Sequence, residues 1–411
     1  MKRILLASTA IVAFAGAAHA DGHLGIGWAG DAEFGWNDDV DDGIFWALGL
    51  TVTGTAELDN GYSASISGDV ELVNSPEFDD GDDSILIANG GSAFDGNEVE
   101  IDDLVISIFN DTSSLRFGDT APAADAIWSS PVTNLDADGF NDEDDLENED
   151  AILIGRATFG EVEVGVSYGV VDSNGDDENT LNDGSDDDLL GLQVGAAATL
   201  GAVDLVFGYQ EEIDGQSTEI VDIDFANTPE IWSIGGSTTL AGAEVGAAYA
   251  TAEGSSGAGV DSLGLQAAFS FGDITTTVFY VFQDGENADG SDADIDDNYG
   301  FAVDYAAGAL TVGFLYHDGS DEDIQLNLAY DLGNGLSLFG GYRDEGENIL
   351  DQEQAEIYYV GADYDLGGGA TIRASYADVS EGEGGVASTL DELGAAEDVK
   401  EGATLQISFT F

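Results

Sequence analysis

The sequence predicts an all-β fold, a transmembrane antiparallel β-barrel of about 16–20 strands. Through most of the chain, apolar and polar residues alternate with a period of two, which is typical of strands that have one apolar face. These strands occur in pairs around short turns, and longer acidic segments separate the pairs. Beyond residue 20 no apolar stretch approaches the roughly 18 residues that a transmembrane helix requires, so the sequence excludes a helical membrane protein.

The first 20 residues predict a secretory signal peptide. Lys2 and Arg3 supply its positive start, residues 4–18 are apolar, and Ala18-His19-Ala20 is typical of a cleavage site. We therefore expect residues 1–20 to be removed and residues 21–411 to form the mature barrel domain.

Nine short turns predict nine hairpins, because glycine or asparagine supplies the positive φ that tight turns need. The turns lie at residues 58–61, 110–111, 159–160, 200–201, 241–242, 271–272, 307–308, 333–335 and 367–369. The clearest hairpin spans residues 357–377, where Tyr358, Val360 and Tyr364 share one face and Asp363 and Asp365 the other. With a first strand near residues 24–28 and a last near 403–411, the count reaches twenty strands.

Short turns at one end and long loops at the other are typical of an outer-membrane barrel, whose apolar face points at lipid. Aromatic residues near strand ends then predict interfacial girdles. The candidates are Trp28, Trp46, Trp128, Trp232, Tyr168, Tyr249, Tyr342, Tyr358, Tyr364 and Tyr376. In the last strand Leu405, Ile407, Phe409 and Phe411 alternate with polar residues, and the terminal Phe resembles the signal that barrel-assembly machinery recognises.

Composition limits the partners. Among 411 residues there are 84 Asp+Glu and 7 Lys+Arg, a net charge of −77 that repels nucleic acid and anionic membrane surfaces. The chain has no cysteine and only three histidines, His19, His23 and His317, which argues against thiolate or histidine metal centres. A catalytic base beside a nucleophile is not evident, and His317 next to Asp318 is expected to be a solvated strand end. We expect no enzymatic activity.

Two segments resemble a known family. Residues 114–119, Ser-Leu-Arg-Phe-Gly-Asp, continuing to Trp128, look like the place in Gram-negative general diffusion porins where the third external loop turns into the lumen. Residues 358–377 are similar to the penultimate hairpin of alphaproteobacterial porins. The resemblance implies a homotrimer in the outer membrane that passes small hydrophilic solutes and ions passively, although such porins usually have 16 strands.

The resemblance implies a constriction loop at about residues 119–150, which contain eleven acidic residues and no basic one. Acidic residues in a lumen favour cations. Candidates for the constriction are Asp119, Asp125, Asp136, Asp138, Asp142 and Glu143, facing Arg116, Arg156, Arg343 and Arg373 on the wall. Strand alternation points these four arginines inward, where solvation alone also explains them.

The same loop has the spacing of a calcium site. Asn134, Asp136, Asp138, Asp142 and Asp145 stand at positions 1, 3, 5, 9 and 12 of an EF-hand-like loop, with the carbonyl of Phe140 at position 7. No cofactor is required, but the spacing predicts that Ca²⁺ orders this loop. The alternative is a solvated acidic loop without metal.

One other class of protein fits the composition, a secreted acidic calcium-binding adhesin or surface-layer protein. It would explain the acidity, the 57 glycines and the lack of cysteine. Against it, the chain shows no tandem nonapeptide repeat and ends on an alternating strand with a terminal Phe.

Overall fold

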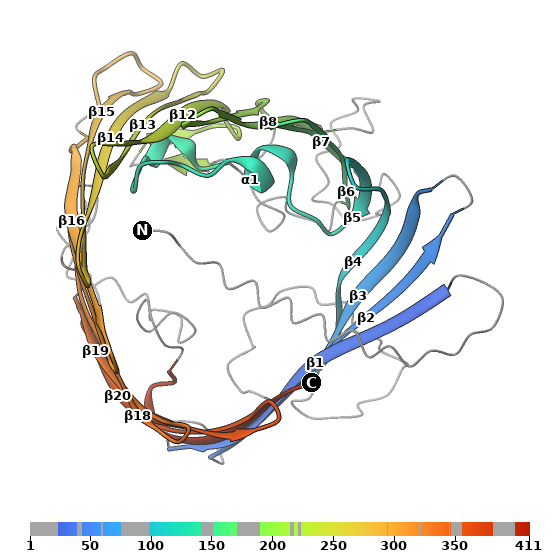
Figure 1. Ribbon diagram of the computed structural model, residues 1–411. Coiled ribbons are helices and arrows are strands. Elements are labelled where there is room, and N and C mark those ends of the chain that lie inside the picture. The colour runs from blue at the N-terminus through green and yellow to red at the C-terminus, as the bar shows by residue number, and fades with distance from the viewer. Residues whose placement is uncertain are drawn as a thin grey trace.

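The computed structural model is a closed antiparallel barrel of 20 strands (Figure 1). It describes residues 24–38, 43–58, 61–74, 98–140, 151–170, 190–213, 218–220, 223–293, 295–319, 322–344, 346, 356–380 and 399–411. The upper end of the predicted strand range is therefore confirmed. Within these residues, no helix is long and apolar enough to cross a membrane. The predicted signal peptide, residues 1–20, lies outside the described residues.

Each barrel strand pairs with its neighbours in chain order. The strands are β1 (Leu24–Asn37), β2 (Ile44–Glu57), β3 (Ser63–Asn74), β4 (Glu98–Phe109), β5 (Ser113–Gly118), β6 (Ala151–Phe159), β7 (Val162–Val170), β8 (Leu190–Leu200), β9 (Val203–Gln210), β12 (Glu230–Leu240), β13 (Ala243–Glu253), β14 (Gly259–Phe271), β15 (Ile274–Glu286), β16 (Asn298–Ala307), β17 (Leu310–Asp318), β18 (Asp323–Gly333), β19 (Leu336–Asp344), β20 (Glu356–Gly367), β21 (Ala370–Ser380) and β22 (Gly402–Thr410). A small hairpin, β10 (Thr218–Ile220) and β11 (Ile223–Phe225), lies in the connection from β9 to β12.

The first and last strands close the barrel. β1 pairs with β2 on one side and with β22 on the other, from Asp31 opposite Thr410 to Asn37 opposite Thr404. The N–H groups of Gly30 and Phe411 each donate to the other's carbonyl oxygen, at 2.9 and 2.8 Å. The rings of Trp28 and Phe411 meet edge to face across this seam, so both are held at the outside of the wall.

All nine predicted short turns join consecutive strands, and they lie at one end of the barrel, here called the turn end. Local chemistry explains them: at the turn between β18 and β19, Asn334 and Gly335 have φ angles of 56° and 82°. The longer connections lie at the opposite end, called the loop end. The first residues of β1 and the last residues of β22 also lie at the turn end.

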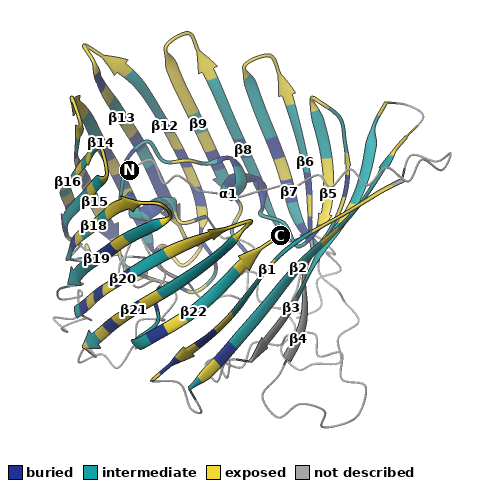
Figure 2. Cartoon of the chain, turned by 60° about the horizontal axis from the view of Figure 1, so that its bottom comes forward, coloured by how far each residue is buried: buried dark blue, intermediate teal, exposed yellow. Residues whose placement is uncertain are grey.

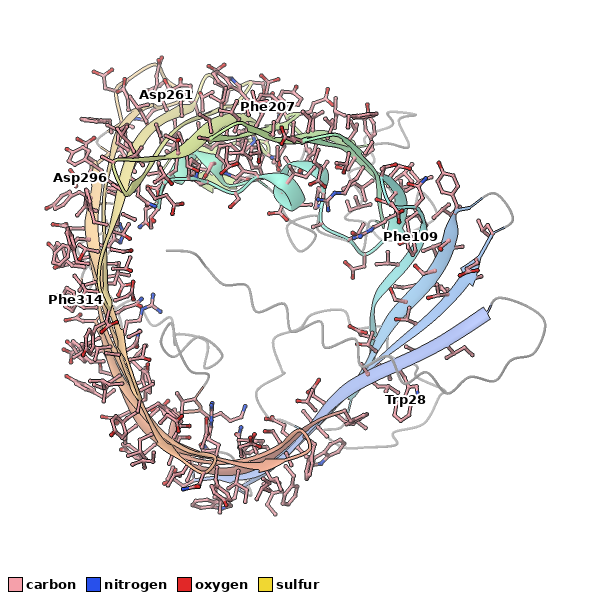
Figure 3. All side chains as sticks on the ribbon, in the orientation of Figure 1. Trp28, Phe109, Phe207, Asp261, Asp296 and Phe314 are labelled. Atoms are coloured by element: carbon pink, nitrogen blue, oxygen red, sulfur yellow. The ribbon has the colours of Figure 1, made fainter. Side chains whose placement is uncertain are left out.

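Large apolar side chains point outward along the strands, which is the arrangement that a lipid-facing wall requires. Ile26 and Phe271 are 71% and 72% exposed, and Figure 2 shows exposed and buried positions alternating along the strands. Figure 3 shows the ring of Trp28 on the outside of the wall. Of the ten predicted girdle aromatics, nine lie on barrel strands. Trp128 is the correction, because it follows helix α1 (Ala123–Ile127) inside the barrel.

The outer aromatic girdle includes tyrosine–carboxylate pairs that the sequence did not predict. Near the loop end, tyrosine hydroxyl groups donate hydrogen bonds to carboxylates on their own or a neighbouring strand or loop. The pairs include Tyr209–Glu230, Tyr249–Asp261, Tyr280–Asp297, Tyr299–Asp318 and Tyr342–Asp344. Each ring thus lies against the apolar wall while its hydroxyl reaches the charged rim.

The main apolar clusters lie inside the barrel, where loops fold onto the inner wall. The largest joins Phe225 of β11 and Val132 and Leu135 of the connection between β5 and β6 to wall residues such as Val260 and Val281. A second cluster joins Phe339, Ile357, Tyr359 and Ala377 to Val399. The inner wall is therefore partly covered by protein, and these loops decide what faces the lumen.

Candidate functional site

The third loop, residues 119–150, is described over residues 119–140. It begins where β5 ends at Gly118, whose φ of 126° is open only to glycine. A Cβ at this position would overlap the carbonyl oxygen of Leu104, which accepts the N–H of Asp119 at 3.1 Å. The Gly-Asp pair therefore ends the strand and turns the chain inward.

Helix α1 lies inside the barrel against β6, β7, β8 and β9 (Figure 1). Its first N–H groups, which have no partner within a helix, donate to the wall. Ala123 donates to Oγ of Ser167 at 2.8 Å and Ala124 to Oε1 of Gln193 at 3.2 Å. Gln193 is held in turn by Gln210 at 3.1 Å. Polar wall residues thus fix the start of the helix.

Glycines on successive strands make room for the loop against the wall. A Cβ at Gly165 would lie 2.7 Å from Cδ1 of Ile127, and one at Gly264 would lie 2.6 Å from Cγ1 of Val132. Such distances are too short for carbon atoms, so these positions accept no side chain while the loop is in place. The others that the loop covers are Gly195, Gly208, Gly235 and Gly246.

The tip of the loop is bound to β15, β16 and β17. Nδ2 of Asn134 lies 2.8 Å from Nε2 of His317. Oδ2 of Asp136 accepts from Asn298 at 2.6 Å and from Gln283 at 2.8 Å. Residues 119–140 of the loop therefore lie along the inner wall from β6 to β17. The expectation that His317 is a solvated strand end was wrong: it is 7% exposed, beneath the loop tip.

Asp138 ends the short helix η1 (Asp136–Asp138) and lies beside Trp128. Trp128 Nε1 donates to its Oδ2 at 2.8 Å, and the Trp128 and Phe140 rings meet edge to face. Burial raises the pKa of Asp138 to about 6, against the smaller lowering effect of the hydrogen bonds from Trp128 and Ser130. This carboxyl group therefore changes charge just below neutral pH.

Four of the six predicted constriction carboxylates are described, and all belong to the loop inside the barrel: Asp119, Asp125, Asp136 and Asp138. Asp142 and Glu143 lie outside the described residues. Within residues 119–140 the loop carries no basic side chain. The described part of the loop therefore brings carboxylates into the barrel without a basic residue of its own.

The predicted calcium ligands have separate partners. The side chains of Asn134, Asp136 and Asp138 contact His317, Asn298 and Trp128 respectively, and Phe140 covers Gly208. Asp142 and Asp145 lie outside the described residues. In the described part of the chain, no group of three or more histidines and carboxylates is placed to hold a metal ion. The calcium site stays a prediction.

The four wall arginines lie on the inward face of their strands, and three of them are paired with carboxylates. Arg156 Nη2 lies 2.6 Å from Glu163, and Arg343 Nε lies 3.5 Å from Asp323. Arg373 makes two bonds of 2.8 Å to Asp363. Arg116 is exposed and makes no ion pair within the described residues. Neighbouring strands therefore neutralise most of the positive charge on the wall.

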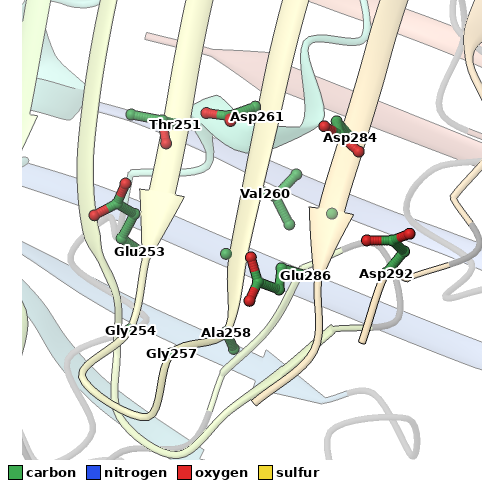
Figure 4. Close-up of a pocket in the computed structure, with 12 residues that line it drawn as sticks. Thr251, Glu253, Gly254, Gly257, Ala258, Val260, Asp261, Asp284, Glu286 and Asp292 are labelled. Carbon is green, nitrogen blue, oxygen red and sulfur yellow. The ribbon is translucent and has the colours of Figure 1, made fainter. Parts of the chain in front are cut away.

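Charge also gathers at the loop end of β13–β15. Five carboxylates line a pocket of about 240 Å³ there, formed by the strand ends and by the turn at Gly254 and Gly257 (Figure 4). They are Glu253, Asp261, Asp284, Glu286 and Asp292. They make this part of the barrel rim negative, as the carboxylates of the third loop do inside the barrel.

Sequence reasoning missed the residues that anchor the third loop. Ser167, Gln193, Gln283 and Asn298 are inward polar side chains near the loop ends of four strands. Only Gln193 gave a local signal, since it is the one long polar side chain on an inward face of small residues. Only the barrel shows that they stand at one level beneath one loop.

Comparison with known proteins gives a family and a set of similar structures. The family model for Gram-negative porins matches residues 7–384. No curated protein matches the chain. Among solved structures, a triple mutant of Rhodopseudomonas blastica porin has a TM-score of 0.43 and 13% identity, over 94% of this chain and 100% of that chain. A porin refined at 1.8 Å resolution has a TM-score of 0.40 and 18% identity over the same shares.

Proposed function

The chain belongs to the Gram-negative porin family and is an outer-membrane channel, and from this we propose that the channel prefers cations. Small hydrophilic solutes cross this channel by passive diffusion. The family and the closed barrel are those of a channel rather than an enzyme. The outward band of apolar side chains, which needs lipid, also favours this function over the secreted adhesin alternative.

One observation carries the cation preference. The third loop lies within the lumen and carries carboxylates without a basic residue, while Arg156, Arg343 and Arg373 are paired with carboxylates of neighbouring strands. The field at the third loop is therefore negative, which raises the local concentration of cations and opposes anions.

The reversal potential of single channels in a planar bilayer under a KCl gradient tests this proposal. We expect a potential of the sign that cation selectivity gives, reduced when Asp119 and Asp125 are both changed to Asn. The matched control is neutralisation of Asp289 and Asp292, two carboxylates on the exposed connection after β15. A wild-type channel without cation selectivity would contradict the proposal. Equal effects of the two double variants would instead move the selecting charge away from the third loop.

We also propose a homotrimer, and the support is a gap in the outer girdle. Within the described residues, the tyrosine–carboxylate pairs occur from β9 to β20 and none lies at the loop end of β1–β5. The outward faces of β3–β5 carry aliphatic residues instead, including Ile66, Ile106, Ile108 and Leu115. A face without interfacial tyrosines suits contact with another copy of the chain better than contact with headgroups.

Light scattering of the detergent-solubilised protein tests the homotrimer. We expect a trimer mass for the wild type and a monomer mass for the double variant Ile106→Asn and Leu115→Asn. The control is Leu263→Asn with Leu265→Asn on β14, which is outward but lies under the girdle. A trimer in both double variants would show that β3–β5 do not form the interface.

Export and assembly complete the proposal. Leu405 and Phe409 on β22, and Phe411 directly after it, are exposed on the outer side of the wall, where assembly machinery could recognise them. We expect the mature chain to begin at Asp21, which N-terminal sequencing checks, and Phe411→Ala to slow assembly because it loses the ring contact with Trp28.

Calcium binding by the third loop rests on ligand spacing alone, and a calorimetric titration against Asp136→Asn with Asp138→Asn tests it.

A further inference from the structure

A second segment of the chain lies inside the barrel, opposite the third loop. It is the end of the connection between β21 and β22, residues 399–401. Val399 is 2% exposed and packs with Phe339, Ile357, Tyr359 and Ala377 on the inner faces of β19, β20 and β21. Because Ile357 and Tyr359 are themselves 0% and 5% exposed, this contact is a packed one and not a chance approach.

The next two residues extend the contact to the closing seam. The ammonium group of Lys400 lies 5.0 Å from the centre of the Phe45 ring, on the inner face of β2. Asn37 of β1 donates from Nδ2 to the carbonyl oxygen of Glu401 at 2.6 Å. The segment is therefore held at three points, on β19–β21, on β2 and on β1.

The positive charge of Lys400 is not offset by a carboxylate in the way that the charges of the paired arginines are. A carboxylate partner cancels most of a guanidinium charge, as at Arg156 and Arg373. An aromatic ring stabilises a cation without adding a negative charge, so the field of Lys400 persists in the lumen. Lys400 makes no ion pair within the described residues, and it is the only lysine after residue 20.

Its position gives this charge a consequence. The strands β19 and β20, against which Val399 packs, lie across the lumen from α1 (Figure 1). We propose that residues 399–401 form a second lumenal element and that Lys400 is a specificity-determining residue of the channel. Its charge limits the cation preference set by the third loop and keeps the pathway open to small solutes that carry a carboxylate or phosphate group. The inference rests on the proposed channel function.

Single-channel reversal potentials under a KCl gradient test Lys400 directly. We expect Lys400→Gln to raise the ratio of K⁺ to Cl⁻ permeability by about twofold, and Lys400→Arg to leave it near the wild-type value. The matched control is Ala288→Asp, which makes the same change in net charge on the exposed connection after β15. A Lys400→Gln ratio equal to that of the wild type, or a shift equal to that of Ala288→Asp, would overturn the inference.

The anchoring of the segment has its own test. Val399→Ser removes the apolar contact with Ile357 and Tyr359 but keeps the charge of Lys400. If the segment holds Lys400 in the lumen, this variant also raises the permeability ratio, and it increases the conductance because the segment leaves the wall. Unchanged conductance and ratio in a variant that folds, as judged by its resistance to unfolding in cold detergent, would contradict a second lumenal element.

The two proposals fail in different ways. A wild-type channel that does not select cations contradicts the proposed preference, whatever Lys400 does. A cation-selective wild type with an unresponsive Lys400 contradicts only the present inference.

Discussion

His317 shows how a single polar residue of the wall can hold a loop that determines transport. Its Nε2 lies 2.8 Å from the amide nitrogen of Asn134, 183 residues earlier in the chain, and its ring packs beside Phe279. In the neutral ring this nitrogen can accept the amide hydrogen, so the pair needs no net charge. A buried amide that loses such a partner costs about 1–3 kcal/mol.

We predict that His317→Leu makes the third loop mobile at its tip. The amide of Asn134 then has no partner on β17, so the open-channel current should become noisier while the mean conductance changes little. His317→Gln, which can still hydrogen-bond, should be quieter than His317→Leu. Equal noise in the two variants would show that hydrogen bonding at this position does not hold the loop. Power spectra of single-channel currents measure the effect.

Asp138 gives a prediction on pH. Burial raises its pKa from 3.8 to about 6, so the folded protein keeps this proton to a higher pH than the unfolded chain does. The free energy of unfolding contributed by Asp138 is therefore highest below the unfolded value and is lost as pH rises through about 6. Between pH 5 and 7.5 we expect a loss of about 1 kcal/mol, after allowance for residual solvation.

Comparison with Asp138→Asn isolates this contribution from that of the many other carboxylates. The variant keeps an oxygen acceptor for Trp128 but does not titrate. Denaturant unfolding at the two pH values should therefore show a smaller change for Asp138→Asn than for the wild type. The same pH dependence in both proteins would mean that Asp138 is ionised in the folded state at pH 5.

At the scale of elements, the third loop and the strands beneath it fit each other. The strands supply glycines where the loop approaches and polar side chains where its N–H groups need acceptors. A glycine within a strand weakens the strand, so these glycines are explained by the close approach of the loop.

We predict that a side chain at Gly195 displaces helix α1. A Cβ there would overlap the carbonyl oxygen of Ala123 and lie 2.7 Å from Cβ of Ile127, so Gly195→Val should move α1 into the lumen and lower the conductance. Overpacking of this kind costs about 1–3 kcal/mol, measurable as a lower unfolding midpoint. Gly27→Val is the control, since the nearest heavy atom to its Cβ is 3.9 Å away. Similar conductance in both variants would contradict the close fit.

At the scale of the whole molecule, charge dominates. Acidic residues outnumber basic ones 84 to 7, and carboxylates occur in the third loop, in the pocket at β13–β15 and in the tyrosine girdle. Charges spread over the whole barrel act on a passing ion only within a Debye length, which is about 10 Å at 0.1 M salt and about 3 Å at 1 M.

The cation preference should therefore depend on salt. We predict a ratio of K⁺ to Cl⁻ permeability that falls several-fold when the same gradient is moved from about 0.1 M to about 1 M salt. Reversal potentials at the two mean concentrations measure it. A ratio independent of salt would mean that ions are selected by direct contact with a few carboxylates and not by the summed field.

The sequence by itself determined the barrel and the place where its loop begins. Period-two alternation and the nine glycine or asparagine turns are local properties, and they predict strand faces and turn ends without knowledge of any distant residue. Gly118 is of the same kind, because its positive φ depends on its own backbone. Local patterns left the strand number between 16 and 20. The number is settled only when β1 pairs with β22 and the barrel closes.

The tertiary structure alone decided what the loop touches and which charges remain. Ala124 meets Gln193 across 69 residues and Asn134 meets His317 across 183, because closure brings distant strands beneath one loop. Closure also sets Arg373 beside Asp363 and Lys400 over Phe45, so the charge count of the sequence does not give the charge that the lumen presents. The physical reason is that register and strand order, which place these side chains, are properties of the closed sheet and not of any segment.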